Sequence, residues 1–300
     1  MRSKSNVSLM LVILTWVSVI GAQFRLEKEI IPRAVREGVH FNAIVVNEFG
    51  DIYLLESKFS EIYRCDRNGN ILNRNGGFGW DIGQFDQPSD LCISGLDIVV
   101  VDQNNHRLVR YDRRLNYITT QDLRSESHSL IYPLSLATMQ LNEIYVLCGE
   151  TAEIMRLYIE KNEQTWFGGI EYGAYALNRP VSLRLNQKGI LTVLQQDGSL
   201  VQYDRYGTPS GLIPAPPHKD DEVKASGLAT IQNDWLVLID NGASLQMFSA
   251  KTNIWCQPVL IGYDQSTSYV AATYINNRLF LLTKDGKIVV FLREQSDSKP

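Results

Sequence analysis

Short apolar runs separated by polar turns recur along the chain at a nearly constant spacing. One set of runs repeats after 46, 46, 46, 45 and 43 residues, at Ile62, Leu108, Ile154, Leu200, Leu245 and Ile288. A second set precedes it in each unit and reads DIYLLE, DIVVVD, EIYVLC, ILTVLQ, WLVLID and RLFLLT. A third set comes earlier still, marked by Ile44, Leu91, Leu136, Leu183, Leu228 and Val270. The pattern predicts six repeats, each with three short strands in fixed order.

The runs are rich in Val, Ile, Leu and Tyr and are bounded by Gly, Asn and Asp, which is typical of antiparallel strands joined by tight turns. A period near 45 residues with several strands per unit predicts an all-β fold, a six-bladed β-propeller of four-stranded antiparallel blades. The expected fourth, outer strands include the segments NILNR, NYITT, QTWFG and IWCQP.

The two ends of the chain complement each other in this scheme. The last unit has no outer strand, because only the polar segment REQSDSKP follows Leu292, while FRLEKEIIP (24–32) precedes the first unit without a partner. Since closure protects sheet edges, we expect an N-terminal strand from Leu26 to Ile31 to complete the last blade. The propeller then spans residues 23–293 as one domain, and residues 294–300 form a polar C-terminal tail.

Residues 1–22 have the order of a secretory signal peptide, with basic Arg2 and Lys4, an apolar run from Val7 to Ile20, and the small residues Gly21 and Ala22. The apolar run holds about 14 residues, whereas a helix that spans a bilayer needs ~20. We therefore expect cleavage near Ala22 and a secreted or periplasmic protein with no membrane span after signal removal.

Charge and cysteine content narrow the possibilities. A net charge of −4, from 29 basic and 33 acidic residues, leaves no electrostatic footprint for nucleic acid or an anionic membrane. The cysteines Cys65, Cys92, Cys148 and Cys256 could pair in three ways in an oxidising compartment, and their spacing fits no metal knuckle. Because the chain has too few cysteines for a disulfide scaffold, we interpret them as buried single thiols. Cys65 is expected to pack as apolar bulk, since it shares a repeat position with Tyr111, Leu157, Tyr203, Phe248 and Phe291.

The second unit, GQFDQPSDLCISGLDIVVVDQNNHRLVRYD, carries the most specific motif in the chain. It resembles the NHL repeat, in which Gly-x-Phe before a Pro is followed by a strand, a strand that ends in Asp, an Asn-His-Arg turn and a third strand. The matching residues are Gly83, Phe85, Pro88, Asp102, Asn105, His106 and Arg107. The other five units share only the hydrophobic frame. The resemblance implies a propeller and covers about one sixth of the chain as a motif.

We interpret the Asn-His-Arg cluster as a turn rather than a catalytic site. Asn105 can adopt left-handed backbone geometry, Asp102 can accept hydrogen bonds from the amides that follow, and Arg107 can reach neighbouring acids. The same turn occurs in NHL-like proteins of unrelated roles, so His106 is expected to be structural.

Arg184 stands out at a position near the axis that small or apolar residues hold in other units. The equivalent residues are Val45, Cys92, Ala137, Ala229 and Ala271. A charge at a crowded position must reach water or a partner, because burying it alone costs several kcal/mol. Arg184 is therefore a candidate for binding an anion or an acidic side chain in the central channel, and the alternative is a structural salt bridge to a neighbouring blade.

Propellers of this kind bind partners on the face formed by the second-to-third strand turns and the connections between blades. That face should carry the segments 76–85, 167–177, 214–224 and 262–269. Two of them combine Gly with aromatic residues expected to be exposed, which makes Phe78, Trp80, Phe167, Tyr172 and Tyr175 candidate binding residues. The alternative is that these rings fill gaps between blades.

The sequence favours an exported, non-catalytic scaffold that binds a protein, peptide or glycan, with no cofactor and no metal. Some secreted six-bladed propellers are metal-dependent lactonases or lyases, so the alternative is such an enzyme with an axial acid-rich site. None of His40, His106, His128 and His218 falls at an evident axial position in the repeat, and Asp102, Asp240 and Asp285 could form an acidic rim or simply stabilise turns. The ligand and the oligomeric state stay open.

Overall fold

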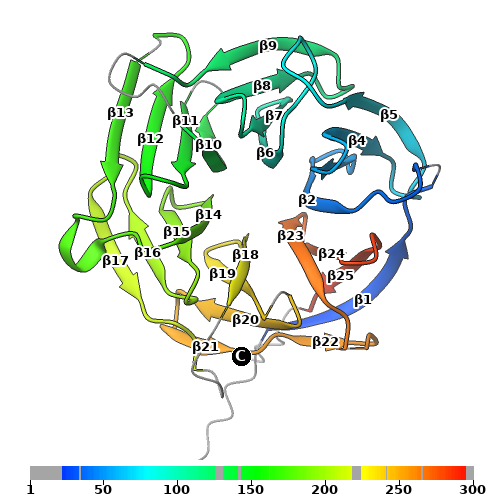
Figure 1. The fold of residues 1–300 in the computed structure, drawn as a ribbon. Helices are drawn as coiled ribbons and strands as arrows, with labels where there is room; N and C mark the ends of the chain where they lie inside the picture. The colour runs from blue at the N-terminus through cyan, green and yellow to red at the C-terminus, as the bar shows by residue number, and fades with distance from the viewer. Residues whose placement is uncertain are drawn as a thin grey trace, which may run out of the picture.

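The computed structural model describes residues 22–294, apart from 34, 126–130, 141–142, 162, 218–223, 241 and 265. Six β-sheets stand around a central axis and form a closed ring (Figure 1). Five of these sheets are four-stranded, with their strands in chain order, and the sixth combines strands from both ends of the chain. The predicted six-bladed β-propeller is confirmed. The expected signal peptide lies outside the described residues except for Ala22.

Each blade runs from an inner strand at the axis to an outer strand at the rim, and blades 1–6 are numbered by their inner strands. The inner strands are β2 (Phe41–Val46), β6 (Pro88–Ser94), β10 (Pro133–Gln140), β14 (Pro180–Leu185), β18 (Ala225–Ile231) and β23 (Tyr269–Ile275). The second strands are β3 (Ile52–Glu56), β7 (Asp97–Asp102), β11 (Glu143–Cys148), β15 (Leu191–Gln195), β19 (Asp234–Ile239) and β24 (Arg278–Thr283). The third strands are β4 (Glu61–Cys65), β8 (Arg107–Tyr111), β12 (Glu153–Tyr158), β16 (Leu200–Tyr203), β20 (Ser244–Ser249) and β25 (Ile288–Arg293). The outer strands are β5 (Ile71–Gly76), β9 (Tyr117–Asp122), β13 (Glu163–Gly168), β17 (Pro209–Ile213), β21 (Ile254–Cys256) and, for blade 6, β1 (Gln23–Ile30).

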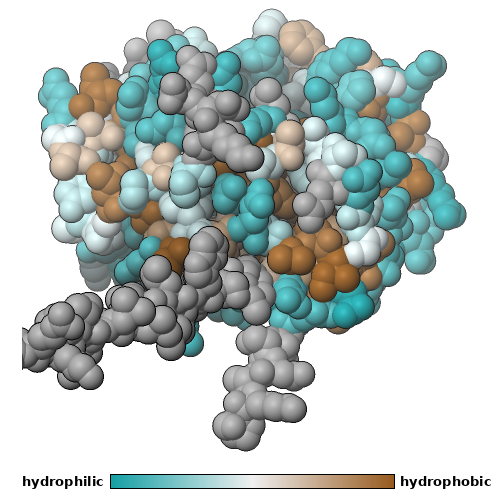
Figure 2. Space-filling view, turned by 90° about the horizontal axis from the view of Figure 1, so that it is seen from below, coloured by the Kyte–Doolittle hydropathy of each residue, from teal (hydrophilic) through white to brown (hydrophobic). Residues whose placement is uncertain are grey.

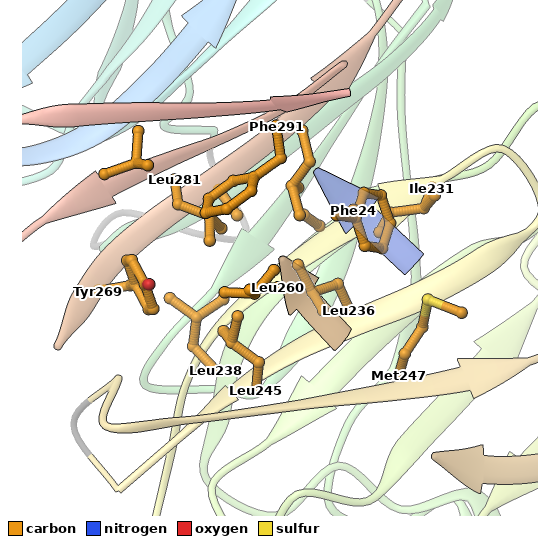
Figure 3. Packing of buried hydrophobic residues seen from close by; sticks show 14 residues of the cluster. Phe24, Ile231, Leu236, Leu238, Leu245, Met247, Leu260, Tyr269, Leu281 and Phe291 are labelled. Atoms are coloured by element: carbon orange, nitrogen blue, oxygen red, sulfur yellow. The ribbon is translucent and has the colours of Figure 1, made fainter. Parts of the chain in front are cut away.

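The N-terminal strand closes the ring as predicted, although it begins earlier than expected. β1 pairs antiparallel with β25, from Phe24 opposite Arg293 to Ile30 opposite Ile288. A short strand that was not predicted, β22 (Val259–Ile261), pairs parallel with the start of β1. Phe24 of β1 and Leu260 of β22 belong to the same buried cluster as residues of blades 5 and 6 (Figure 3). The two chain ends are therefore tied together by packing as well as by hydrogen bonds.

Burial follows the position of a strand within its blade. Every residue of β3, β11 and β15 is buried, because a second strand is covered on both faces by neighbouring blades. The outer strand β17 instead alternates between partly buried and exposed residues over Pro209–Leu212. On the side of the ring that lies at the lower edge of Figure 1, apolar side chains form separate groups among polar ones (Figure 2). Among the described residues no helix is long and apolar enough to cross a membrane.

The cysteines match the expectation of buried thiols in part, because Cys65 and Cys148 are buried whereas Cys92 and Cys256 are only partly buried. Cys65 lies opposite Ile52, just as Tyr111 lies opposite Ile98 in the next blade, so the thiol does take the position of an aromatic ring. All four cysteines are free thiols, and burial raises the pKa of Cys65 and Cys148 to about 12. These two thiols stay protonated at neutral pH.

The expected register of the last inner strand was wrong by two residues. Ala272 lies opposite Leu281, as Ile44 lies opposite Leu54 in blade 1, so Ala272 and Thr273 take the positions assigned to Val270 and Ala271. The register of every inner strand shifts near its start, where a β-bulge adds a residue to one strand only. Such a bulge breaks the strict alternation on which the sequence alignment depended.

Candidate functional site

The turns between second and third strands and the connections between blades meet on one face of the ring, as predicted. In blade 2 the Asn105 side chain donates to the carbonyl oxygen of Gly79 at 2.9 Å, and the carboxylate of Asp102 accepts from the Asp86 amide at 2.7 Å. In blade 1 the Gly77 amide donates to the Ser60 carbonyl at 2.7 Å. We call this side of the ring the loop face.

The Asn-His-Arg turn of blade 2 holds the connection from blade 1, which we call the first loop (residues 77–87). Arg107 pairs with buried Asp102 at 2.7 Å through Nε. Its terminal nitrogens donate to the carbonyl oxygens of Trp80, Asp81 and Gln84 at 2.8, 3.2 and 2.9 Å. Burial raises the pKa of the Asp102 carboxyl, against the opposing effect of hydrogen bonds from Asn105, the Asp86 amide and Arg107. The turn is a clamp that fixes the backbone of the first loop.

The geometry of the turn differs from the expected one in a detail. His106, rather than Asn105, adopts the left-handed conformation, with φ of 55°. Its Nδ1 lies 2.5 Å from the carbonyl oxygen of Ile131, and its ring meets the edge of Tyr132 with centroids 4.7 Å apart. Asn105 does not adopt this conformation, and its side chain donates a hydrogen bond to the carbonyl oxygen of Gly79. The structural interpretation of His106 agrees with these contacts.

The first loop displays three large apolar side chains on this fixed backbone. Phe78 is 71% exposed and Trp80 is 76% exposed, as the sequence predicted. Ile82, which was not predicted, is also 76% exposed. The loop also has its own hydrogen bonds, because the Gly79 amide donates to Phe85 and the Phe85 amide donates to Gly77, both at 2.9 Å. The exposed side chains therefore project from an ordered loop.

The second aromatic connection (residues 169–179, the second loop) is built differently, and two of its expected binding residues were placed wrongly. Phe167, at the end of β13, is only 6% exposed and packs on Tyr203 with ring centroids 5.4 Å apart. Tyr175, in the short 3-10 helix η1 (Gly173–Tyr175), packs partly buried against the same cluster. Of the three binding residues expected at this connection, only Tyr172 is exposed. Ile170, which was not predicted, is exposed in the same loop. Phe167 and Tyr175 therefore fill a gap between blades 3 and 4, which was the alternative to a binding role.

A cavity of about 90 Å³ lies among the starts of the inner strands, and Arg184 lines it. Arg184 pairs with Asp90 through two contacts of 2.7 and 3.2 Å and also donates to Ser135 Oγ at 3.0 Å. The three residues come from blades 4, 2 and 3, so one ionic cluster links three neighbouring blades at the axis. Arg184 therefore makes a salt bridge to Asp90 of another blade, which was the structural alternative predicted from the sequence.

Asp90 was missed in the sequence, although a signal for it exists. It holds the inner-strand position of Ala43, Ser135, Ser182, Gly227 and Ala271. A lone carboxylate in a column of small residues is as unusual as Arg184 in the column next to it. The equivalence was visible, because Asp90 directly precedes Leu91 as Ala43 precedes Ile44; what the sequence did not show is the contact of Asp90 with Arg184 two blades away.

The acids and histidines considered for an enzyme do not converge where the structure describes them. Asp102 is engaged with Arg107, while Asp285 accepts from Thr283 at 2.5 Å and pairs with Lys287 at 3.1 Å. Over the described residues no group of three or more His, Cys, Asp or Glu side chains could hold a metal ion. His128 and His218 lie outside the described residues, and so does most of segment 214–224.

Comparison with known proteins gives a local family match and a wide fold match. Residues 85–111 match the family model of the NHL repeat. A catalytically inactive virginiamycin B lyase from Staphylococcus aureus, solved with quinupristin, is similar with a TM-score of 0.61 and 12% identity, over 88% of this chain and 99% of that one.

Two other solved structures are similar at the same level. The WD40 repeats of RRP9 align with a TM-score of 0.59 and 10% identity, over 89% of this chain and 100% of that one. The extracellular domain of a putative hybrid two component system of Bacteroides thetaiotaomicron aligns with a TM-score of 0.58 and 15% identity, over 93% of this chain and 34% of that one. No curated protein matches the chain. At these identities the likeness concerns the fold alone.

Proposed function

We propose, from the premise that the chain is a six-bladed β-propeller with an NHL repeat, that it is an exported binding scaffold without catalytic activity. It recognises a protein, a peptide or a glycan through the loop face. Export is supported by the order of basic, apolar and small residues over positions 1–22.

The observation that carries the proposal is the first loop. Phe78, Trp80 and Ile82 are more than two thirds exposed, while Arg107 and Asn105 fix the backbone beneath them. A binding partner would gain the burial of large apolar side chains without having to order the loop that carries them. Such preorganised aromatic anchors are typical of binding hot spots, because little conformational entropy is lost on association.

The experiment compares capture by matched variants of the exported chain. Wild type, Phe78→Ala and Trp80→Ala are immobilised and tested against a glycan array and against extracts of the producing cells. Leu96→Ala serves as the control, because Leu96 is 59% exposed in the turn between β6 and β7, at the end of the blade opposite the loop face. A ligand that the wild type and the control retain and that both loop variants lose supports the proposal. Equal capture by all four proteins rejects it.

Export is tested separately by sequencing the N-terminus of the protein recovered outside the cytoplasm. A mature chain that begins near Gln23 supports export by signal cleavage. A protein found only in the cytoplasm with residues 1–22 intact contradicts it.

A further inference from the structure

The axial cavity is not needed for binding through the first loop, and its chemistry points to a ligand of its own. Its described lining comes from all six blades and includes Asn42, Ser89, Ser135, Ser182 and Ser226 besides the Asp90–Arg184 pair. A volume of about 90 Å³ is several times the roughly 10–15 Å³ that one water requires. Solvent reaches the cavity wall, because the Arg184 side chain is 28% exposed.

The charge of the lining argues against an ionic ligand. Asp90 and Arg184 are the charged residues among the described residues of the lining, and they neutralise each other at 2.7 Å. A bound anion would meet the Asp90 carboxylate, and a bound cation would meet the Arg184 guanidinium. Neither gains a net opposite charge. The site therefore suits a neutral molecule.

The unused hydrogen-bonding groups of the lining specify the ligand further. Asn42 has a buried side-chain oxygen without a hydrogen-bond partner in the described structure. Arg184 bonds to Asp90, Ser135 and Leu183 through its terminal nitrogens, and its Nε–H has no hydrogen-bond partner among the described residues. A ligand that donates to Asn42 and accepts from Arg184 would satisfy both groups. Carboxylates and phosphate esters mainly accept and ammonium groups only donate, whereas a hydroxyl group does both.

We propose that the axial cavity binds a small, neutral, polyhydroxylated molecule, a polyol or a single sugar unit. Asn42 accepts one ligand hydroxyl, Arg184 donates to another, and Ser182 offers a hydroxyl in the same wall. The Asp90 carboxylate holds the guanidinium in place and acts as a positioning residue. The proposal does not depend on the first loop.

The test is ligand-observed NMR and titration calorimetry on the full exported chain with glycerol, D-glucose, D-galactose, D-mannose and D-xylose. At least one of these probes should bind saturably. Asn42→Ala and Ser182→Ala each remove one neutral hydrogen-bonding group and should weaken binding about three- to tenfold. Ala271→Leu places a larger side chain in the cavity wall and should abolish binding.

The matched control is Leu96→Ala, an exposed residue outside the lining of the cavity, which should bind the same probe with unchanged affinity. Circular dichroism of each variant confirms folding, and the two alanine variants keep the test decisive if Ala271→Leu does not fold. The proposal is overturned if no probe binds, which would mean that the cavity holds water only. It is also overturned if Asn42→Ala and Ser182→Ala bind as the wild type does.

Discussion

The first and second loops have similar compositions but opposite structural roles. Both connect one blade to the next, and both combine glycines with aromatic residues. The first loop leaves Phe78 and Trp80 exposed above a hydrogen-bonded backbone, whereas Phe167, just before the second loop, is buried and Tyr175 within that loop packs partly buried against the core. Composition alone therefore does not tell a binding loop from a packing loop.

The difference comes from the turn beneath each loop. Gln195 of blade 4 holds the position of Asp102, and its side chain accepts from the Asn178 amide as Asp102 accepts from Asp86. The position of Arg107 is held in blade 4 by Ser199, whose hydroxyl bonds to Asp197 inside its own turn. Without a long cationic side chain to hold the loop carbonyls, the second loop is fixed by burying its own rings. The first loop is instead held by hydrogen bonds from Arg107, so its aromatic side chains can stay exposed to solvent.

The largest expected effect comes from removing the ring closure on which both loops stand. Deletion of residues 23–32 removes β1 and with it the buried side chains of Phe24 and Ile30, each worth about 1.5–3 kcal/mol. The melting temperature should fall by roughly 10 °C or more, as measured by differential scanning calorimetry. An unchanged melting curve would contradict the role of β1 in closing blade 6.

The next largest effect is a difference in stability between alanine variants of the two loops. Phe167→Ala leaves a hole beside Tyr203 and should lower the free energy of unfolding by about 3–5 kcal/mol. Phe78→Ala removes an exposed ring and should change it by no more than about 0.5 kcal/mol. Urea unfolding of the two variants measures both values. Similar losses would show that the loops do not differ in the way the structure indicates.

A smaller effect should follow from weakening the clamp. Arg107→Lys keeps a positive charge beside Asp102 but loses the planar fork that reaches three carbonyl oxygens, at a cost of about 1–3 kcal/mol. Amide hydrogen exchange at Gly79 and Phe85 should become faster, and exchange at Leu177 in the second loop should not change. Unaltered exchange in the first loop would refute the clamp.

The smallest effect is expected from metal ions. The first loop is held by Arg107 and the second by core packing, so neither arrangement uses a metal in the described residues. Addition of zinc, calcium or a chelator should leave the melting temperature unchanged, and calorimetry should show no stoichiometric binding. Tight stoichiometric uptake of zinc or calcium would reopen the lyase or lactonase alternative.

The repeat could be predicted from the sequence because buried second strands give continuous apolar runs whose spacing survives divergence. The N-terminal strand could be predicted for a different reason, because without it β25 would be an unpaired sheet edge. One failure lies where alternation breaks. A bulge at the start of the last inner strand displaced Ala272 from its expected position. The role of Asp90 depends on Arg184 two blades away, and the burial of Phe167 depends on Tyr203 of the next blade, so neither follows from the local sequence.

The pairing of β1 with β25 also has a consequence for how the chain reaches its native state. They are the first and last strands of the propeller in chain order, so the ring stays open until all six blades have emerged from the ribosome or crossed a membrane. Contacts between such distant segments form slowly, because a very long loop must close before they contribute. During that interval β1 has no antiparallel partner, and the chain is most prone to aggregation or to chaperone binding just before β25 pairs with it.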